Sequence, residues 1–365
     1  MLPIVFASDP SSLSPDPVVF VDGSPPPGDG RTGDLHLSHW PGNRTPKALK
    51  RELSTETAFA FLELDEAERV RLLRNAAALV LNHLDTDGIC ALFVLVRSEA
   101  ARKSRELLSE VAAAGDFFAA PSERAVAIDA ALRNLSDPNR SAFAREIQSL
   151  EVSVRRGRMV EHALDLLGEL LVDDGARPEL WEPDIERHRE DLQQLEKATF
   201  DDLVYLDFGV WTARTSTGGS FDPGRHAFLG GGRLDRALLL GVSTEGTTAR
   251  LVIGTRSFFD RPEGAGSPRP DLDRLVKDLN DAERAVGGGS GEFEWRAQPT
   301  ATASPELWFG RSGLPLFEER AGDYLAPSRL DPVTIKGKVL DAIRATWALP
   351  DDDDEPEDGE NIFAV

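Results

Sequence analysis

The sequence contains a single cysteine, Cys90, among its 365 residues. One cysteine cannot form a disulfide within the chain, and a thiolate zinc site needs more sulfur ligands than one residue supplies unless several histidines help. This scarcity excludes a fold held together by disulfides. It also predicts that any bound metal is held by oxygen and imidazole groups.

A long hydrophobic run is also missing. Nowhere do about 18 uninterrupted apolar residues occur, the length that a membrane-spanning helix needs. The start of the chain, Met1–Asp9, has neither the basic region nor the apolar segment of a secretion signal. We therefore expect a soluble, cytoplasmic protein without a membrane partner. Its hydrophobic content of 41% is enough to fill a substantial core.

Basic residues are scarce beside acidic ones. The chain has 41 Lys and Arg against 63 Asp and Glu, which gives a formal net charge of -22. Residues 351–360 hold eight of the acidic residues and no basic one, so about -14 remains on the rest of the chain. Because nucleic-acid binding depends largely on Lys and Arg neutralising phosphates, this excess argues against a long duplex as partner. It does not exclude a small phosphorylated ligand in a local basic pocket.

The pattern of apolar residues predicts an α/β fold with a domain boundary near residue 200. Before it, short β-like runs lead into a long block with helical periodicity; after it, β-like runs return between glycine-rich turns. We predict a first domain over residues 1–199, an α+β domain over 200–349 and a disordered acidic tail over 350–365.

The expected elements are short strands in both domains and helices mainly in the first. The expected strands are Val18–Val21, Asp34–Trp40, Ala78–Leu81, Leu203–Leu206, His226–Leu229, Ala237–Leu240 and Ala249–Ile253. The expected helices cover residues 47–53, 65–77, 88–113 (as one helix or two), 121–134, 140–172, 271–280 and 336–347. The stretch 287–291 is expected to be a flexible loop.

The segment Asn82–Gly88, Asn-His-Leu-Asp-Thr-Asp-Gly, holds the best candidate functional residues. If the chain stays extended beyond the preceding strand, alternation places His83, Asp85 and Asp87 on one face. Mixed imidazole and carboxylate ligands suit Mn²⁺, and less selectively Mg²⁺, Fe²⁺ or Zn²⁺. Gly88 permits a tight turn into a helix whose N-terminus attracts a phosphate. The alternative is a polar turn in which Asp87 caps the helix and His83 is only hydrogen-bonded.

The segment Ala78–Cys90 resembles the first motif of the DHH superfamily of phosphoesterases, in which His-x-Asp-x-Asp-Gly follows a buried strand and supplies metal ligands. The resemblance extends to about residue 120. It implies a Mn²⁺-dependent phosphoesterase fold, with a parallel sheet flanked by helices. The implied substrates are short oligonucleotides, cyclic dinucleotides, nucleotide phosphates or pyrophosphate. On this resemblance His83, Asp85 and Asp87 are metal ligands.

Other motifs of that superfamily are matched less well. Asp116, after the following helix, corresponds to the family's next single aspartate. No Asp-His-His tripeptide occurs, and Gly224–Ala227 only partly resembles the Gly-Gly-Gly-His substrate signature. Either His36, His39 or Asp207 replaces the missing ligands, or the chain is a divergent or inactive relative.

Candidates also lie around the expected strand 34–40. His36 and His39 are three positions apart, so one straight strand would point them to opposite faces and at most one would reach the metal. His39, beside a loop, is the better candidate, and packing against the neighbouring Trp40 is the alternative for both. Arg44 and Lys47 suit phosphate binding, with a solvated surface as the alternative.

Two hypotheses about function remain. The first is a metal-dependent phosphoesterase-like hydrolase of a small nucleotide or phosphorylated substrate, with Asp85 and Asp87 as catalytic residues and Arg44 and Gly88 binding the substrate. The second is a catalytically inactive DHH-like protein that binds a ligand or serves as a scaffold. In that case the acidic tail could be a docking peptide for a protein partner. Arg155–Arg158 forms a local basic patch, for which an exposed helix face is the simpler explanation.

Overall fold

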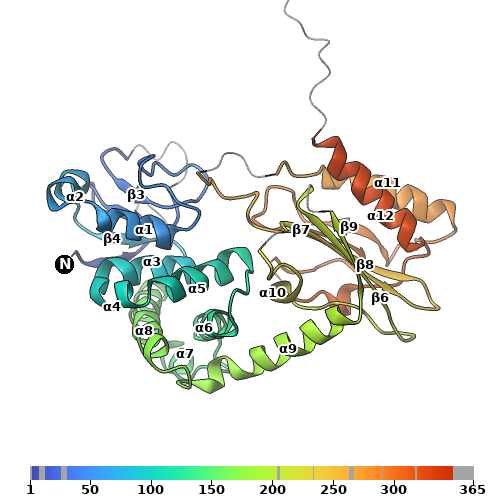
Figure 1. Ribbon diagram of the computed structural model, residues 1–365, viewed down its shortest axis with the longest axis horizontal. Helices are drawn as coiled ribbons and strands as arrows, with labels where there is room; N and C mark the ends of the chain where they lie inside the picture. Colours follow the sequence, from blue (N-terminus) through green and yellow to red (C-terminus); the bar gives the residue numbers. More distant parts are fainter. Residues whose placement is uncertain are drawn as a thin grey trace, which may run out of the picture.

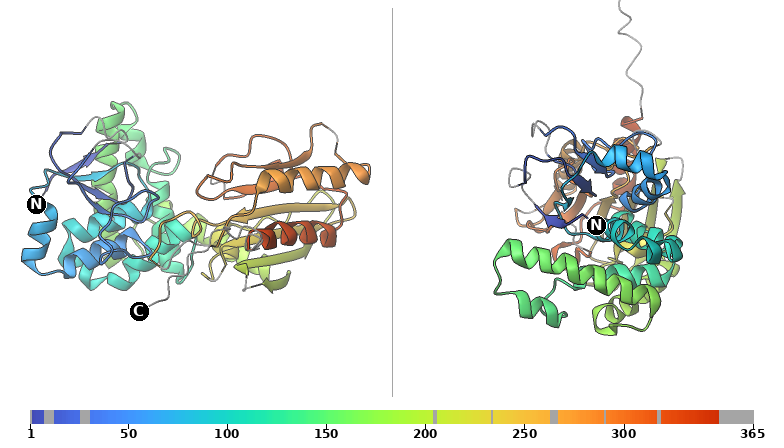
Figure 2. Two further views of the ribbon diagram at one scale, coloured as in Figure 1. Left: turned by 90° about the horizontal axis from the view of Figure 1, so that it is seen from above. Right: turned by 90° about the vertical axis from the view of Figure 1, so that its left-hand side faces the viewer.

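The structure, a computed structural model, describes residues 2–7, 13–25, 31–203, 206–232, 234–262, 267–289, 291–316 and 319–347. The described chain forms two sheets with helices packed around them, as expected of an α/β fold (Figure 1). A four-stranded sheet lies in the N-terminal part, which we define as residues up to 196. A six-stranded sheet lies in the C-terminal part, from residue 199 onward. Figure 2 shows the two sheets at opposite ends of an elongated molecule.

The four-stranded sheet is entirely parallel, with the order β1-β4-β2-β3. Its strands are β1 (Ile4–Phe6), β2 (Val19–Val21), β3 (Leu35–Leu37) and β4 (Leu79–Leu81). Every residue of β2, β3 and β4 is buried, which explains why these runs are apolar without alternation. Because the strands are parallel, the segments that leave β2, β3 and β4 emerge at the same edge of the sheet.

Helices of the N-terminal part pack mainly on one face of this sheet (Figure 1), where Val19, Leu37 and Leu81 share a core with them. Phe20 and Val80, on the other face, lie in a small apolar cluster without helix residues. The helices of this part are α1 (Ser54–Glu63), α2 (Glu66–Leu73), α3 (Thr86–Val96), α4 (Ser98–Lys103), α5 (Arg105–Phe117), α6 (Glu123–Asn134), α7 (Ala142–Ile147), α8 (Val152–Val172), the 3-10 helix η2 (Pro178–Leu180) and α9 (Glu182–Glu196). Helix α3 is the most apolar of them and packs against α1, α5 and α8, so the chain directly after β4 is held in the centre of the core. Helix α9 runs toward the six-stranded sheet.

The six-stranded sheet is mixed, with the order β5-β6-β7-β8-β10-β9 and one parallel pair, β6 with β7. Its elements are β5 (Thr199–Leu203), β6 (Phe208–Arg214), α10 (Arg225–Phe228), β7 (Arg236–Val242), β8 (Thr247–Ile253), α11 (Leu272–Ala285), β9 (Glu294–Ala297), β10 (Glu306–Gly310), the 3-10 helix η4 (Gly322–Tyr324) and α12 (Pro332–Ala345). Helices α11 and α12 lie side by side over one face, with their apolar residues in the same core as the strands.

The segment that follows β8 connects the two parts of the molecule. Phe259 is buried in the hydrophobic core of the N-terminal part. The hydroxyl of Thr255 donates a hydrogen bond to the carbonyl of Asp116, and the backbone N–H of Asp260 donates to the carbonyl of His39 at 2.8 Å. The C-terminal part therefore contacts the edge of the four-stranded sheet where the strands end.

Two predicted elements are wrong. Residues 47–53 form no helix; α1 begins at Ser54, because the Asp87 carboxylate accepts the backbone N–H groups of Ser54 and Thr55 and so fixes the start of the helix. The run His226–Leu229 belongs largely to helix α10 and not to a strand. Such a short apolar run has no periodicity that separates the two structures.

Other predictions differ from the structure in extent. Residues 88–113 fall into three helices, α3, α4 and α5. Of the expected strand at Leu203–Leu206, Leu203 ends β5 and Leu206 lies beyond it. Residues 204–205 lie outside the described residues, as do residue 290 of the expected loop and the expected tail over 350–365. The six-stranded sheet begins at Thr199, and the domain division stays a prediction. No helix within the described ranges has the length and apolar character needed to cross a membrane.

Candidate metal centre

A cluster of aspartate and histidine side chains lies at the edge where β2, β3 and β4 end. Asp22 follows β2 directly, His39 is the second residue after β3, and His83 and Asp85 follow β4. Ligands of open α/β sheets gather at the carboxyl ends of the strands, because chains leaving neighbouring strands meet there. The parallel sheet thus brings together residues that are far apart in the sequence.

Two groups of three side chains are each able to hold an ion. One group is Asp22, His39 and Asp87, all buried; the other is Asp22, His83 and Asp85, partly open to solvent. Within each group the ligand atoms lie within 4.8 Å of one another. Asp22 belongs to both. Its Oδ1 is 3.6 Å from His39 Nε2, and its Oδ2 is 2.9 Å from His83 Nε2, so one carboxylate faces both groups.

His39 Nε2, in the buried group, and Asp116 Oδ2, beside that group, form a short ion pair without a well-aligned hydrogen bond. His39 Nε2 is 2.9 Å from Asp116 Oδ2 and 3.7 Å from Asp87 Oδ2. His39 Nε2 and Asp116 Oδ2 are both buried, yet their contact lacks hydrogen-bond geometry, and neither has another hydrogen-bond partner within the described chain. Buried polar atoms without partners are costly. A cation bound between an imidazole nitrogen and carboxylate oxygens would satisfy both.

The surrounding chain fixes the orientation of His39. Its Nδ1 makes a short contact with the backbone carbonyl of Glu52, and its ring stacks on Phe259 with ring centroids 3.9 Å apart. A histidine that donates Nδ1–H to a carbonyl keeps Nε2 as a lone-pair donor, the arrangement usual for metal-binding histidines. His39 is therefore positioned to present Nε2 to the cluster, with Phe259 supplied by the C-terminal part.

The start of helix α1 holds two of the acids. The backbone N–H groups of Ser54 and Thr55 donate to the Asp87 carboxylate at 2.7 and 2.9 Å. The hydroxyl of Ser54 donates to Asp22 Oδ1 at 2.6 Å. These N–H groups lie at a helix N-terminus, where they have no partner within the helix, and their hydrogen bonds favour a charged carboxylate.

The group nearer to solvent is held by the turn between β4 and α3. Asp85 caps α3: its Oδ1 accepts the backbone N–H of Gly88 at 2.8 Å, and its Oδ2 lies 2.7 Å from His83 Nε2. A Cβ atom at position 88 would lie 2.9 Å from Asp85 Oδ1 and 3.2 Å from Asp22 Oδ2. A glycine is thus needed because a side chain would intrude between two proposed ligands.

Burial and mutual repulsion perturb the pKa values of the cluster. Burial, together with the charge of Asp22, raises the pKa of Asp87 to about 7. Burial also acts to raise the pKa of Asp22, but contacts with His83 and His39 outweigh it and lower the value to about 2. Burial disfavours a charged His39, yet the contact with Asp116 and the nearby acids raise its pKa to about 9. Buried acids crowded in this way need compensating positive charge, which a divalent cation supplies.

Most of the predicted site residues lie in this cluster: His39, His83, Asp85, Asp87 and Asp116. The route by which they meet differs from the prediction. Strand β4 ends at Leu81 and Asp87 lies in the first turn of α3, so alternation along one extended strand does not place these residues together. The helix cap is Asp85, so the alternative with Asp87 as cap is wrong.

Other predicted residues lie elsewhere or are used differently. Arg44 bonds His36, with Nη2 3.1 Å from His36 Nε2, and the carbonyl of Arg31, so these contacts direct it away from the cluster. The Asp207 carboxylate accepts the hydroxyl of Ser267. The N–H of Gly88, expected to bind phosphate, is occupied by the side chain of Asp85.

Sequence reasoning missed Asp22, the residue common to both ligand groups. The run Val18–Val21 was expected to be a strand, and the Asp-Gly pair after it indicates a turn. The available signal was an acidic residue directly after a buried β-like run, the same signal that singled out His83. Gly23 adopts a φ of 97°, so the turn does exist beside the ligand.

A second buried network connects the start of α3 to the C-terminal part. Asp129 on α6 accepts the hydroxyl of Thr86 at 2.6 Å and Nε of Arg133 at 2.9 Å. Its Oδ2 is also 3.4 Å from His226 Nε2, on α10. Burial disfavours a charged His226, but contacts with Asp129 and Glu319 raise its pKa to about 9. This network supports the turn that carries the metal-ligand candidates without belonging to either group.

The fold and the cluster together define an α/β protein with a candidate two-ion centre. Over residues 5–354 the chain matches the family described as "Family of unknown function (DUF6687)". The match spans most of the chain, so this protein belongs to that family. Neither a curated protein nor a solved structure matches it. The relationship to DHH phosphoesterases therefore rests only on the resemblance of Ala78–Cys90 to the first motif of that superfamily, and it stays a prediction.

Proposed function

We propose that this protein is a metal-dependent, phosphoesterase-like hydrolase that acts on a small nucleotide or another small phosphorylated substrate. The observation that carries the proposal is the Asp22 carboxylate, which presents one oxygen to each of two ligand groups. A carboxylate shared in this way would let Asp22 help to hold two ions in one centre, as phosphatases and nucleases do.

The donor atoms favour particular ions. Each group combines one imidazole nitrogen with carboxylate oxygens and no sulfur, which suits Mn²⁺ and, less selectively, Mg²⁺. Ions bound in such a pair lower the pKa of a water molecule and neutralise charge on a phosphoryl group. Cys90, the only thiol, is buried in α3 and its pKa is raised by burial, so we assign it no role as a ligand.

The two groups differ in access to a substrate. His39 and Asp87 are fully buried, and we assign them to holding an ion. The side chains of His83 and Asp85 are 26% and 30% exposed, so a phosphate approaches from their side. The ring of Trp40 lies 4.4 Å from that of His83 and, with Phe259, keeps water from the deeper group. A cytoplasmic location accords with such a substrate and stays a prediction.

The test is hydrolysis by the purified full-length chain with Mn²⁺ or Mg²⁺. The substrates are a dinucleotide, nucleoside phosphates and pyrophosphate, and the variants are Asp85→Asn and Asp87→Asn. Glu283→Gln is the matched control, because Glu283 is a buried carboxylate in the C-terminal part that accepts hydrogen bonds from Ser328 and Arg329. We expect Mn²⁺-dependent hydrolysis in the wild type and control, measured as the nucleotide formed from the dinucleotide or the phosphate released from the other substrates, and none in the two aspartate variants.

Calorimetry separates the remaining outcomes. If the folded wild-type chain binds no Mn²⁺, the proposed metal centre is wrong and the proposed function with it. Binding of Mn²⁺ and of a phosphorylated ligand without turnover would instead support the inactive, ligand-binding alternative. Circular dichroism on every variant shows whether a lost activity reflects a lost fold.

A further inference from the structure

Two adjoining cavities open beside the accessible side of the metal centre. The larger, of about 500 Å³, is bordered by His83 at one end, and the smaller, of about 180 Å³, is bordered by Asp85. Leu84 and Ser136 line both, so the two cavities lie next to each other at the turn that carries the ligand candidates. A volume of about 300–1,000 Å³ is usual for sites of small organic ligands. The larger cavity alone falls in this range.

We propose that the larger cavity binds the part of the substrate that does not react, and that this part is an organic ring bearing a second negative charge. The inference rests on the proposed function, because the metal centre next to the cavity determines which group reacts. It adds to that function a class of substrate and a set of residues outside the metal centre.

The walls of the cavity favour an apolar ring. Phe6 from β1, Ile147 from α7 and Met159 from α8 contribute aromatic, branched and thioether surfaces. A methionine thioether adapts well to flat aromatic groups. Asn82 and Gln148 offer a few polar groups for orientation. A cavity that combines apolar walls with polar groups for orientation fits a ring-bearing ligand.

Two arginines supply the charge preference. Arg155 and Arg156, in the first turns of α8, line the cavity, and no acidic residue is among its described lining residues. Arg155 Nη1 donates to the carbonyl of Gln148 at 3.1 Å, and the guanidinium of Arg156 lies 5.1 Å from the centre of the Phe6 ring. Planar guanidinium groups bind phosphate or carboxylate in two-point contacts. On a chain of net charge -22, this is a local attractive site for an anion.

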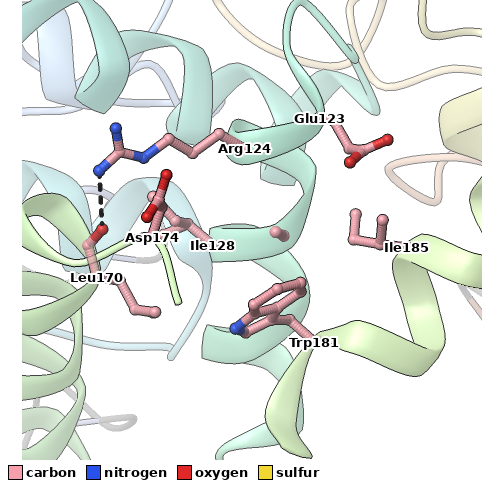
Figure 3. A pocket seen from close by; sticks show the side chains of 8 residues that line it. Glu123, Arg124, Ile128, Leu170, Asp174, Trp181 and Ile185 are labelled. Atoms are coloured by element: carbon pink, nitrogen blue, oxygen red, sulfur yellow. Dashed lines mark hydrogen bonds between the residues drawn. The ribbon is translucent and has the colours of Figure 1, made fainter. Parts of the chain in front are cut away.

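A third cavity, of about 180 Å³ between α6, α8 and α9, lacks the features that favour an anion in the larger cavity (Figure 3). Its Arg124 is engaged with the carbonyls of Leu170 and Leu171, and Glu123 and Asp174 line the same space. Two acidic residues face one arginine there, and none of the metal-ligand candidates borders this cavity. Neither the charge nor the position of this cavity favours an anionic substrate.

The arrangement predicts which substrates the centre prefers. Pyrophosphate would reach the ions but leave the apolar cavity empty. A phosphoester with a ring and a second anionic group would place the ring on Phe6 and Met159 and the anion at Arg155 and Arg156. Binding energy from such remote contacts is available to orient the reacting phosphate.

Calorimetry on the metal-free, full-length chain tests the subsite separately from hydrolysis. The probes are adenosine 5′-monophosphate and uncharged adenosine, and the variant is Arg155→Ala combined with Arg156→Ala. Arg158→Ala is the matched control: it lies on the same helix, its side chain is 65% exposed, it contacts Glu161, and it does not line the cavity. We expect the wild type and control to bind the monophosphate about tenfold more tightly than adenosine, and the double variant to lose that preference.

The possible results distinguish this inference from the proposed function. Equal affinity for the two probes, no binding of either, or equal losses in the control and the double variant would overturn the subsite, even if Mn²⁺-dependent hydrolysis were found. An arginine-dependent preference supports it, even in a chain that hydrolyses nothing. Replacement of both arginines by lysine keeps the charge, so it should retain part of the preference and show that the loss is not a folding defect.

Discussion

Buried charges are arranged differently in the two parts of the molecule. In the C-terminal part Glu306 accepts hydrogen bonds from both Arg225 and Arg250, and Arg250 also bonds Asp222 at 2.7 Å. All four are buried, and the two positive charges meet two negative ones. The charges of this network are therefore balanced among the described residues, although Arg225 Nε has no hydrogen-bond partner there.

The N-terminal part has a buried network in which aspartates outnumber the histidines that they contact. Asp22, Asp87 and Asp116 crowd around one imidazole, His39, and two of the buried polar atoms have no hydrogen-bond partner within the described chain. The comparison separates two uses of buried charge. A balanced network stabilises a fold, whereas an unbalanced one with acids in excess is suited to a cation that comes from solution.

The sharpest test of this difference is Asp22→Asn. The change removes the carboxylate shared by both ligand groups, and the amide of asparagine is a weaker ligand with a donor facing the wrong way. We expect Mn²⁺-dependent hydrolysis to fall on the order of 10⁴-fold, since both ions lose a ligand. Steady-state kinetics measures the loss and calorimetry the weakened Mn²⁺ binding. Unchanged Mn²⁺ stoichiometry and rate would show that Asp22 bridges nothing.

The next effect belongs to the balanced network. Glu306→Ala leaves Arg225 and Arg250 buried without their shared partner, and should lower the free energy of unfolding by about 3–5 kcal/mol. The control is Glu294→Ala on β9, whose side chain is 45% exposed and contacts Arg296. An exposed pair of this kind contributes about 0–1 kcal/mol. Urea unfolding gives both numbers, and similar losses in the two variants would remove the distinction.

A smaller effect is expected from pH. The pKa values of His39 and His226, each about 9, lie above the ordinary value of 6.5, so each contributes stability that is fully present below pH 6.5 and lost as pH rises through 9. We expect each to contribute at most about 3 kcal/mol. Mn²⁺ should abolish the contribution of His39 by displacing its proton, while that of His226 persists until His226→Gln is introduced.

Unfolding of the wild type and of His226→Gln from pH 6 to 10, with and without saturating Mn²⁺, measures both contributions. Identical pH dependence with and without the ion would mean that His39 keeps its proton in the ion-bound state. That result would argue against His39 as a ligand, while leaving the assignment of His226 intact.

The metal-ligand candidates show what a single sequence can reveal. His83, Asp85 and Asp87 stand in one short motif, and His39 lies beside a loop at a strand end, so local pattern was sufficient to select them. Asp22 was missed because its importance depends on strand order. Strands β2, β3 and β4 follow one another in the sequence, but β4 lies between β1 and β2 in the sheet. Only that arrangement places Asp22 beside His83.

For the fold too, the sequence predicted the elements that depend on local pattern and missed those that depend on contacts between distant residues. The segment predicted over residues 121–134 became α6, the one over 140–172 is divided into α7 and α8, and the three strands predicted for the N-terminal sheet became β2, β3 and β4. The helix expected over residues 47–53 was displaced by hydrogen bonds from α1 to Asp87, which is 33 residues from Ser54. A contact between residues so far apart in the sequence cannot be predicted from local helix propensity.

The attachment of the Thr255–Asp260 segment to His39 and Asp116 has one more consequence. The side chains of these two residues would bind an ion, while their backbone carbonyls accept hydrogen bonds from the C-terminal part. Ion binding at the centre and the packing of the two parts against each other would then be energetically coupled, and such coupling acts equally in both directions. An ion that rigidifies His39 and Asp116 would stabilise the contact between the two parts. Separation of the two parts would in turn weaken binding of the ion.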